Sequence, residues 1–513
     1  MLVMEAEYAA LLPVLLLTAV GAMLPLLGAF RLRAGWLILI ASLTIVGAGA
    51  LNLAAMWDIP GLTDVLAPMV GVGQAPIISF GALEYTAFVA LFQLVFLSIA
   101  LIVVLGSNRY ITGPHQGEYY ALLLLSTVGM MLVAASRDLI TLFVGFELSS
   151  FCTYVLAGFF KKRLDSSEAA TKYFLVGGIS SSLAIFGISM VYGLTGSTSF
   201  EALAGLWDDP LRLASGAATT VGQQLIDGRY TLGVFTWALL LAGFGFKIAL
   251  VPFHNYAADV YEGAPSTVGG FVSAGAKHMG FAAIFKVFLL GMFAVKANWE
   301  MVAGILAILT MIVGNVSALQ QTNIKRILAY SSIGQAGYIL IALTVGSEYA
   351  LAGGLFHILT YGFMQAGAFI ALAAAGAWGV GEELADWKGM GRRAPFIAFA
   401  MTIFMLSFAG IPPLAGFASK FTLFSAAIQA GGWYVSLAWV GIAMSAVSLV
   451  YYWRVVRVMY VEEHDGRPVA PAPLSVLALG LGVAATLVLG LFPAIGYDLS
   501  FEAARSLFLA ITP

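Results

Sequence analysis

Five lysines interrupt the long apolar runs of this sequence, and they are the residues best placed to do chemistry. They are Lys172, Lys247, Lys277, Lys286 and Lys420. A charged side chain at the centre of a bilayer costs roughly 2.5 to 3.5 kcal/mol on insertion scales, so each lysine needs a reason to be there. Burial disfavours the charged ammonium, whereas a nearby carboxylate favours it. A buried lysine whose partner approaches and retreats is therefore a site that binds and releases a proton.

The five lysines differ in their depth within the runs. Lys277 and Lys420 lie far from any run boundary and are the strongest candidates for proton sites. Lys247 lies close to Pro252 and to one surface, so a side chain that reaches the interface is an alternative interpretation. For Lys286, nine residues beyond Lys277, we expect that the side chain reaches the interface.

One carboxylate accompanies these lysines, and Lys172 is the least certain of the five. Glu147 lies nine residues after Asp138, and it is the carboxylate that we place well inside an apolar run. A structural ion pair is one interpretation of Glu147, but an ionisable group within a membrane is by default a candidate for function. Lys172 follows Glu168 by four residues, which is the spacing of a favourable helical ion pair, so both structural and functional interpretations stay open for it.

Uncharged polar side chains in the same runs are candidates for lining a hydrated path. A histidine or hydroxyl packed in a helical bundle is at least as often satisfied by a neighbouring residue, so each of them also has a purely structural interpretation. The candidates are His254, His278, Ser331, Ser332, Gln335, His357 and Tyr361.

Composition excludes several classes of function. Of the 513 residues, 61% are hydrophobic and 10% are charged, whereas soluble domains are about 25% charged. The net charge of −2 gives no electrostatic case for binding nucleic acid. The single cysteine, Cys152, excludes an internal disulfide and the roughly four thiolates of an iron–sulfur cluster. With no defensible histidine spacing and no nucleotide fingerprint, we expect no metal and no cofactor on this chain.

The apolar runs predict an all-α polytopic membrane protein with about 14 transmembrane helices in a single membrane domain, residues 1–513. A run of about 20 apolar residues spans a bilayer. The predicted spans are 8–29, 36–57, 85–106, 118–136, 139–160, 169–194, 230–252, 266–293, 299–318, 325–346, 349–378, 396–428, 432–460 and 474–495.

Two of these spans contain proline and a lysine, and we expect both to be broken. The seventh contains Pro252, and the twelfth contains Pro412 and Pro413 within roughly 35 residues, or about 50 Å of helix. Interrupted helices in corresponding parts of two halves are typical of transporters built from inverted repeats. We therefore predict N-terminal helices in 1–117, helices 4–8 as one repeat in 118–293, helices 9–13 as a second repeat in 299–460, and a C-terminal helix at 474–495.

The basic residues predict the orientation of the spans. With the N-terminus outside, the inside loops hold fourteen basic residues and the outside loops hold five, which is the bias of the positive-inside rule. Both termini are then expected on the outer side. The first run follows Glu5 and Glu7 without a basic segment, so it is typical of a first transmembrane helix and not of a removed signal peptide.

Several motifs, in order along the chain, resemble the antiporter-like N subunit of respiratory complex I, which is subunit 2 in mitochondria. The likeness covers roughly residues 120 to 460. The motifs are residues 146–148 (FEL), 154–159 (YVLAGF), 168–174 (EAATKYF), 246–247 (FK), 251–254 (VPFH), 259–265 (DVYEGAP), 322–332 (TNIKRILAYSS) and 410–417 (GIPPLAGF), the last leading to Lys420.

The resemblance implies a proton-carrying axis and a set of partners. The implied axis consists of Glu147, Lys172, Lys247, Lys277 and Lys420. The implied partners are other membrane-arm subunits of a complex I-like assembly, together with a peripheral arm that carries flavin and iron–sulfur clusters and reduces a quinone. We hypothesise that Glu147 and Lys172 form a switchable ion pair that controls Lys247, which passes a proton along Lys277 to Lys420.

The chain departs from the family pattern at a few positions. Tyr256 and Ala258 stand where the family commonly has Trp and Pro, and Gln335 stands where it has histidine. His357 and Gln365 stand where tyrosine and asparagine are expected. These departures leave the lysines intact and concern the route to the outer surface.

We therefore expect a proton-translocating subunit of a redox-driven NAD(P)H, ferredoxin or deazaflavin:quinone oxidoreductase in a prokaryotic plasma membrane. A subunit of a multi-subunit Na⁺/H⁺ antiporter is the main alternative, since it shares the helices and lysines but has no redox arm. A membrane scaffold is disfavoured by the cost of five intramembrane lysines. An independent solute carrier is disfavoured because no polar cluster suggests a substrate pocket.

Overall fold

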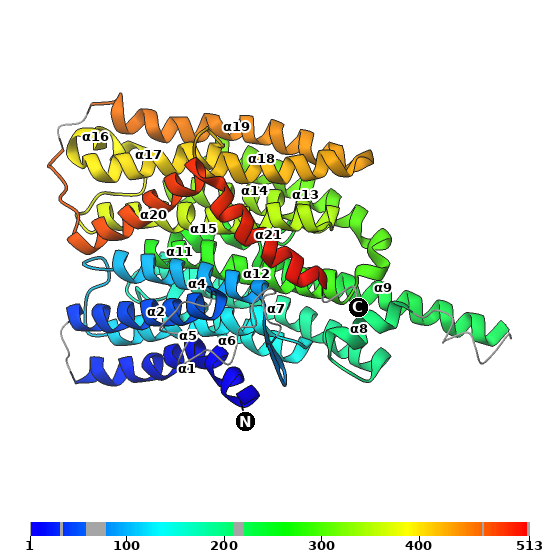
Figure 1. The fold of residues 1–513 in the computed structure, drawn as a ribbon. Coiled ribbons are helices and arrows are strands. Elements are labelled where there is room, and N and C mark those ends of the chain that lie inside the picture. Colours follow the sequence, from blue (N-terminus) through cyan, green and yellow to red (C-terminus); the bar gives the residue numbers. More distant parts are fainter. Residues whose placement is uncertain (1, 31–33, 58–77, 209–219, 464–465, 510–513) are drawn as a thin grey trace.

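The computed structural model describes residues 2–30, 34–57, 78–208, 220–463 and 466–509, and within them it is a bundle of helices. The long helices lie side by side with nearly parallel axes, so that most loops gather at the two ends of the bundle (Figure 1). The N-terminal part consists of α1 (Leu2–Ala29), α2 (Ala34–Trp57), a two-stranded hairpin of β1 (Ile78–Phe80) and β2 (Leu83–Tyr85), and α4 (Ala87–Gly106). The predicted all-α class is confirmed, and this short hairpin is the one element pair that it did not include.

The next segment covers the first predicted repeat. It contains α5 (Gln116–Ala135), α6 (Leu139–Ala157), α7 (Leu164–Thr195), α8 (Phe200–Asp208), α9 (Thr220–Lys247), α10 (Asn255–Gly263), α11 (Ser266–Phe271), the π-helical turn η2 (Val272–Ala276), α12 (Lys277–Phe285) and a second π-helical turn η3 (Lys286–Leu290). The last four form one continuous helical rod that is buried along its whole length.

The remaining elements cover the second predicted repeat and the C-terminus. They are η4 (Phe293–Val295), α13 (Lys296–Leu319), α14 (Ile324–Val345), α15 (Glu348–Gly376), η5 (Leu384–Trp387), α16 (Met390–Arg393), α17 (Pro395–Ala409), α18 (Ala415–Ala430), η6 (Gly432–Tyr434), α19 (Val435–Tyr460), α20 (Pro473–Leu491) and α21 (Pro493–Leu509). The predicted C-terminal span thus divides at Phe492 into two helices, and α21 packs against α15 and α4.

The predicted number of about fourteen spans is not confirmed as an exact count. In the described part of the chain, twelve helices are long and apolar enough to cross a membrane. Two shorter apolar helices, Leu232–Lys247 and Pro395–Ala409, stand where the seventh and twelfth spans were predicted. α9 ends at Lys247 and α17 ends at Ala409, so the chain breaks within both predicted spans, as the prolines led us to expect.

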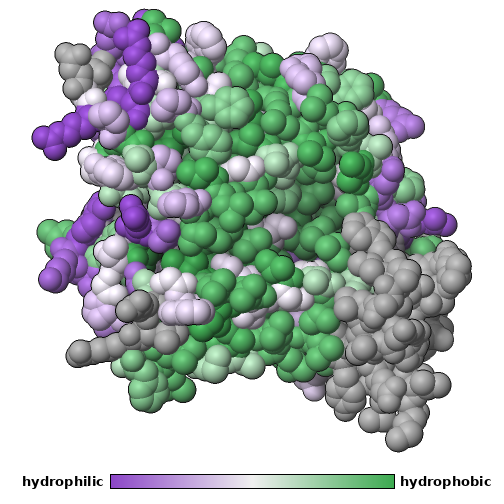
Figure 2. All heavy atoms as spheres, turned by 60° about the vertical axis from the view of Figure 1, so that its left-hand side comes forward, coloured by the Kyte–Doolittle hydropathy of each residue, from purple (hydrophilic) through white to green (hydrophobic). Residues whose placement is uncertain are grey.

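The surface of the bundle matches a hydrocarbon environment. Large apolar side chains such as Leu43, Phe421 and Trp439 are more than 60% exposed. One face shows a broad apolar band between polar edges (Figure 2). Soluble proteins do not leave contiguous apolar surface of this extent in contact with water, so the band is the lipid-facing belt of an integral membrane protein.

A residue with positive φ lies at or just after the end of each broken helix, and backbone hydrogen bonds satisfy the last carbonyl groups there. α9 ends at Lys247 near Ala249, whose φ is 57°, and the Leu250 amide donates to the Gly245 carbonyl over 3.0 Å. α17 ends at Gly410, whose φ is 84°, and the Ile411 amide donates to the Leu406 carbonyl over 3.1 Å. α9 and α17 enter the bundle from opposite ends (Figure 1).

Capping contacts recur at the two ends of the bundle, as inverted repeats require. Asp138 accepts bonds from the first amides of α6, and the Leu139 amide donates to Thr198 in the loop after α7. Asn323 accepts from the first amides of α14, and the Ile324 amide donates to Glu382 in the loop after α15. This correspondence supports the predicted repeats 118–293 and 299–460, whose division stays a prediction.

Glycines allow the leading pair of helices in each predicted repeat to approach closely. A methyl group on Gly129 of α5 would lie 2.6 Å from the Gly145 carbonyl oxygen of α6. A methyl group on Gly314 of α13 would lie 2.3 Å from the Gly334 amide nitrogen of α14. In lipid, helices associate largely through such close van der Waals packing, so small residues are needed at these two contacts.

We expect Gly314→Ala to destabilise the protein by about 1 to 3 kcal/mol, because the methyl group forces α13 and α14 apart. Thermal unfolding of the detergent-purified protein measures the effect. Gly178→Ala is the matched control, since Gly178 lies on α7 with no atom within 4 Å of the added methyl. Equal melting temperatures for the two variants would contradict the packing argument.

Candidate functional site

Lys247 is buried at the C-terminal end of α9 and faces α6 and α7. Its ammonium donates to the Ser150 hydroxyl over 2.8 Å and to the Tyr173 hydroxyl over 3.0 Å. The rings of Phe146, Tyr154 and Tyr173 lie 5.1 to 5.6 Å from the same nitrogen. Aromatic faces attract a cation, so this cage stabilises a charged lysine without supplying a carboxylate. The side chain is 2% exposed, and the predicted interfacial alternative for Lys247 is therefore wrong.

Lys277 begins α12, directly after the π-helical turn η2. Its ammonium donates to the carbonyl oxygen and the hydroxyl of Ser332 on α14, over 2.9 and 2.8 Å. Lys247 packs one turn further along α12, where a methyl group on Gly280 would lie 3.1 Å from the Lys247 Cβ. Single π-helical turns occur often at functional sites, and here two of them flank the buried lysine of α12.

Lys420 lies on α18 beside the break that separates α17 from α18. Its ammonium donates to the Phe408 carbonyl over 2.7 Å and to the Ser445 hydroxyl over 2.9 Å, and the Tyr338 ring lies 4.6 Å away. The break frees the carbonyl groups at the end of α17, and one of them becomes an acceptor for the lysine. A groove of about 410 Å³ between α18 and α19 opens beside Lys420 on the outer face of the bundle.

Polar side chains connect the surroundings of Lys277 and Lys420. On α14, Ser331 lies 2.5 Å from the Tyr452 hydroxyl, and the Gln335 amide reaches the same hydroxyl over 3.4 Å and the Phe408 carbonyl over 3.5 Å. Since Phe408 also accepts from Lys420, the network joins α14 to the second broken helix.

His357 extends this network through hydrogen bonds at both of its ring nitrogens. Its Nε2 lies 2.9 Å from Gln335 Oε1, which only accepts, so Nε2 carries the proton. Its Nδ1 lies 2.9 Å from the Ser419 hydroxyl. The ring therefore donates at Nε2, and its Nδ1 faces a hydroxyl that can either donate or accept.

His278 and Tyr361 are buried polar groups that lack a protein partner. Both ring nitrogens of His278 and the Tyr361 hydroxyl have no hydrogen-bond partner among the described residues. Their rings lie 5.5 Å apart, and His357 lies 6.2 Å from Tyr361. Buried groups of this kind are usually satisfied by water, so this segment of the site is suited to hold water between α12 and α15.

Glu147 is half-buried on α6, one helical turn before Ser150. It accepts a hydrogen bond of 2.5 Å from the Ser181 hydroxyl of α7. Ser150 in turn accepts a hydrogen bond from Lys247 of α9. The Glu147 carboxylate and the serine that contacts the lysine therefore lie on neighbouring turns of α6. The structure therefore associates Glu147 with Lys247.

Lys172 forms ion pairs with two other carboxylates, and its switchable pair with Glu147 stays a prediction. Its ammonium lies 2.7 Å from both Glu168 and Asp259. Arg326 of α14 contacts Asp259 over 3.1 Å and Glu262 over 2.6 Å. The break after α9 places the carboxylates of α10 next to Lys172, which no helical spacing along the sequence reveals.

Asp259 stays ionised in this cluster, outside the membrane-spanning segments. Burial by itself would raise the pKa of this carboxyl group, but the hydrogen bonds from Lys172 and Arg326 outweigh burial and hold the pKa below its usual value. His254, at the start of α10, is half-buried, and its Nδ1 has no partner among the described residues.

Lys286 corrects a second expectation, since its side chain does not reach the interface. It is 0% exposed, and its ammonium contacts Glu84 over 2.6 Å and the Ser136 carbonyl over 2.7 Å. The hairpin β1–β2 positions Glu84 for this pair. Sequence reasoning missed Glu84 because it lies just before the predicted span 85–106. A carboxylate at the boundary of a span could have indicated a partner for a buried lysine.

The chain is similar in sequence to membrane subunits of respiratory enzymes. A family described as NADH:quinone oxidoreductase/Mrp antiporter, transmembrane, matches residues 136–445. Subunit N of the F420H2 dehydrogenase of Methanosarcina mazei is 44% identical over 81% of this chain and 83% of its own length. Subunit N of the NADH-quinone oxidoreductase of Trichlorobacter lovleyi is 41% identical over 85% of this chain and 89% of its own.

The fold is also that of a known respiratory subunit. A chain of respiratory complex I from Thermus thermophilus superposes with a TM-score of 0.76 and 29% identity, over 95% of this chain and 98% of that chain. The sequence relatives and the structural neighbour thus both belong to the group of respiratory complexes that the sequence motifs indicated.

We expect Lys286→Met to destabilise the protein by about 3 to 5 kcal/mol, because it leaves the Glu84 carboxylate without its cation. Lys286→Met combined with Glu84→Gln removes both charges and recovers most of that loss. Thermal unfolding measures all variants, with Arg392→Gln as control because the pair of Arg392 with Glu463 is more than 80% exposed on both sides. A double variant no more stable than Lys286→Met would contradict a mutual ion pair.

Proposed function

The chain belongs to the family of N subunits of NADH-quinone and F420H2 dehydrogenases, and from this premise we propose that it carries protons through the membrane along its buried lysines. The proposed route includes Glu147, Lys247, Lys277 and Lys420. Electron transfer takes place on other subunits, which hold the flavin, the iron–sulfur clusters and the quinone.

The observation that carries the proposal is that buried ionisable and polar side chains lie on adjacent helices across an apolar bundle. Glu147 and Ser150 share adjacent turns of α6, and Ser150 holds Lys247. Lys247 packs beside α12, where Lys277 bonds Ser332 of α14. Gln335, one turn further along α14, shares the Phe408 carbonyl with Lys420.

Lys172 has a controlling role in this proposal. Its two carboxylate partners, Glu168 and Asp259, come from α7 and from the short helix after the break. A shift of α10 relative to α7 changes the charge near the Lys247 cage, since Tyr173 and Tyr256 stack in that cage at 5.5 Å. Such a shift favours or disfavours a proton on Lys247.

The side chains that line the water-holding segment complete the route between the lysines. His278, His357 and Tyr361 lie in a row of ring contacts, and Ser331 and Gln335 face the same region from α14. Together with water, neutral imidazole and hydroxyl groups accept a proton on one side and donate one on the other. His254 lies at the cluster of Lys172 and is the proposed entry from that side.

The remaining assignments concern the surroundings of the chain. Its partners are sister membrane-arm subunits, its membrane is a prokaryotic plasma membrane, and the end rich in basic residues faces the cytoplasm with both termini outside. A Na⁺/H⁺ antiporter subunit is the second candidate, supported by the breadth of the matching family.

Replacing Lys247 or Lys277 by Met is expected to lower proton pumping at least about tenfold, which corresponds to a barrier raised by about 1.4 kcal/mol or more. Glu147→Gln is expected to act in the same direction. The measurement is dye quenching in proteoliposomes that contain the purified complex, driven by its electron donor and quinone, with a native gel to establish assembly.

Lys162→Gln is the matched control for the pumping assay. Lys162 is an exposed lysine in the loop between α6 and α7, outside the proposed route. Undiminished pumping in the assembled Lys247 and Lys277 variants, or equal loss in the control, would refute the route.

The two candidate functions differ in what copurifies with the chain. We expect an affinity-tagged chain, solubilised in mild detergent, to bring down subunits that contain flavin or iron–sulfur clusters, visible by absorbance and identified by mass spectrometry. Recovery of small hydrophobic subunits alone, from membranes with intact respiratory activity, would support the antiporter and exclude the redox complex.

A further inference from the structure

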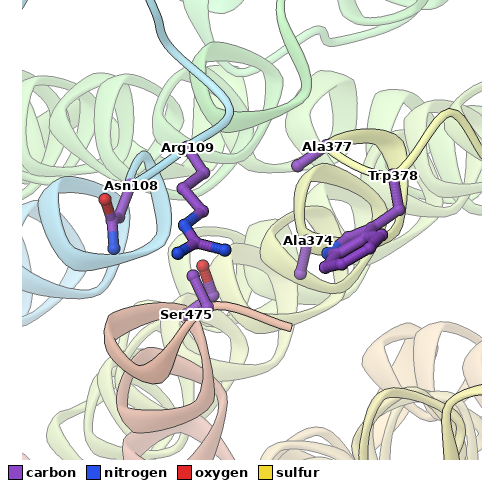
Figure 3. Close-up of a pocket in the computed structure, with 7 residues that line it drawn as sticks. Asn108, Arg109, Ala374, Ala377, Trp378 and Ser475 are labelled. Carbon is purple, nitrogen blue, oxygen red and sulfur yellow. The ribbon is translucent and has the colours of Figure 1, made fainter. Parts of the chain in front are cut away.

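A pocket with polar and apolar lining residues lies at the end of the bundle where the basic loops gather, apart from the lysine route. Its volume is about 230 Å³, and it opens where α4 and α15 end and α20 begins (Figure 3). Three helix termini at one level mark the boundary between the hydrocarbon layer and water. The lining residues are Asn108, Arg109, Ala374, Ala377, Trp378, Ala472 and Ser475, and none of them is acidic.

Arg109 is held in the pocket in an unusual backbone conformation. Its φ is 62°, which few residues other than glycine adopt. Its guanidinium lies in the middle of the pocket, between Asn108 and Ser475 (Figure 3). Arg109 is an exposed residue, and in the described part of the chain its side chain has no hydrogen bond or ion pair. An uncommon backbone conformation that presents an unpaired cation is typical of a binding site.

A second group in the pocket also lacks a partner. Ser475 is 1% exposed, and its hydroxyl points toward the Arg109 guanidinium without forming a hydrogen bond to any described residue (Figure 3). It lies in the first turn of α20, whose N-cap residue, Ala472, has no side chain to bind the free amides. Free amides at a helix N-terminus attract an anion, and Arg109 and Ser475 supply the matching cation and hydroxyl.

We propose that this pocket binds the phosphate group of an anionic phospholipid. The planar guanidinium matches two phosphate oxygens, and the Ser475 hydroxyl and the α20 amides supply further donors. Trp378, 48% exposed, lies across Ala374 at the rim, where an indole ring suits the headgroup region.

The test uses the purified complex in nanodiscs of phosphatidylcholine with a trace of photoactivatable phosphatidylglycerol. After illumination, mass spectrometry quantifies crosslinks in the peptides around Arg109 and Ser475. We expect Arg109→Gln to lower this labelling at least about fivefold, because the bidentate contact is lost. Arg457→Gln is the control, since Arg457 is exposed in the last turn of α19 at the same end and does not line the pocket.

A second variant separates lipid binding from folding. Arg109→Gly removes the cation but favours the observed backbone conformation, so labelling falls while the melting temperature does not. Labelling that is unchanged in both Arg109 variants would overturn the proposal. Labelling of the unmodified protein that millimolar inorganic phosphate displaces would also overturn it, because the pocket would then bind the free anion and not the lipid.

Discussion

The structure depends on one constraint, which is that an ammonium group within the hydrocarbon layer must find acceptors on the protein. Lys247, Lys277 and Lys420 meet it with hydroxyls, carbonyls and aromatic faces, whereas Lys286 and Lys325 are each held by a carboxylate close enough to form an ion pair. Several of these acceptors exist because a helix is interrupted. The break after α17 frees the Phe408 carbonyl for Lys420, and the end of α10 leaves the carbonyls of Glu262 and Ala264 for Lys325. The broken helices therefore supply backbone carbonyls that help to stabilise the buried ammonium groups.

This manner of solvation suits proton movement better than a set of tight salt bridges would. An ammonium held by neutral acceptors becomes a neutral amine without leaving a carboxylate unpaired. Carboxylates instead gather near the Lys172 end, where Glu168, Asp259 and Glu262 surround Lys172 and Arg326. The chain thus separates a charged cluster near one boundary from a neutral, polar interior, and the two meet at the aromatic cage of Lys247.

Similar local structures at the two ends of the bundle explain how one chain provides both the charged cluster and the neutral, polar interior. Corresponding caps, close glycine contacts and helix breaks occur at opposite ends of the bundle, so the same local chemistry faces both directions. The buried rod from α11 to η3 passes between the two sets and carries Lys277 and Lys286. One π-helical turn ends directly before Lys277, and the other begins at Lys286. The extra residue in each turn changes the helical rotation, and this rotation decides which way each ammonium points.

The sequence by itself determined the membrane environment, the helical class, both helix breaks and the identity of the buried lysines, because the energetic cost of charge in lipid leaves a signal in composition and spacing. The family, too, followed from motifs read in order. Only the tertiary structure decided the partners: Asp259 for Lys172, Glu84 for Lys286, Ser332 for Lys277 and Phe408 for Lys420. These pairs join residues from different helices, and the contacts depend on helix rotation, on the breaks and on the hairpin. None of these leaves a periodic pattern along the chain, which is why the Asp259 partner of Lys172 was missed and the interfacial position of Lys286 was predicted wrongly.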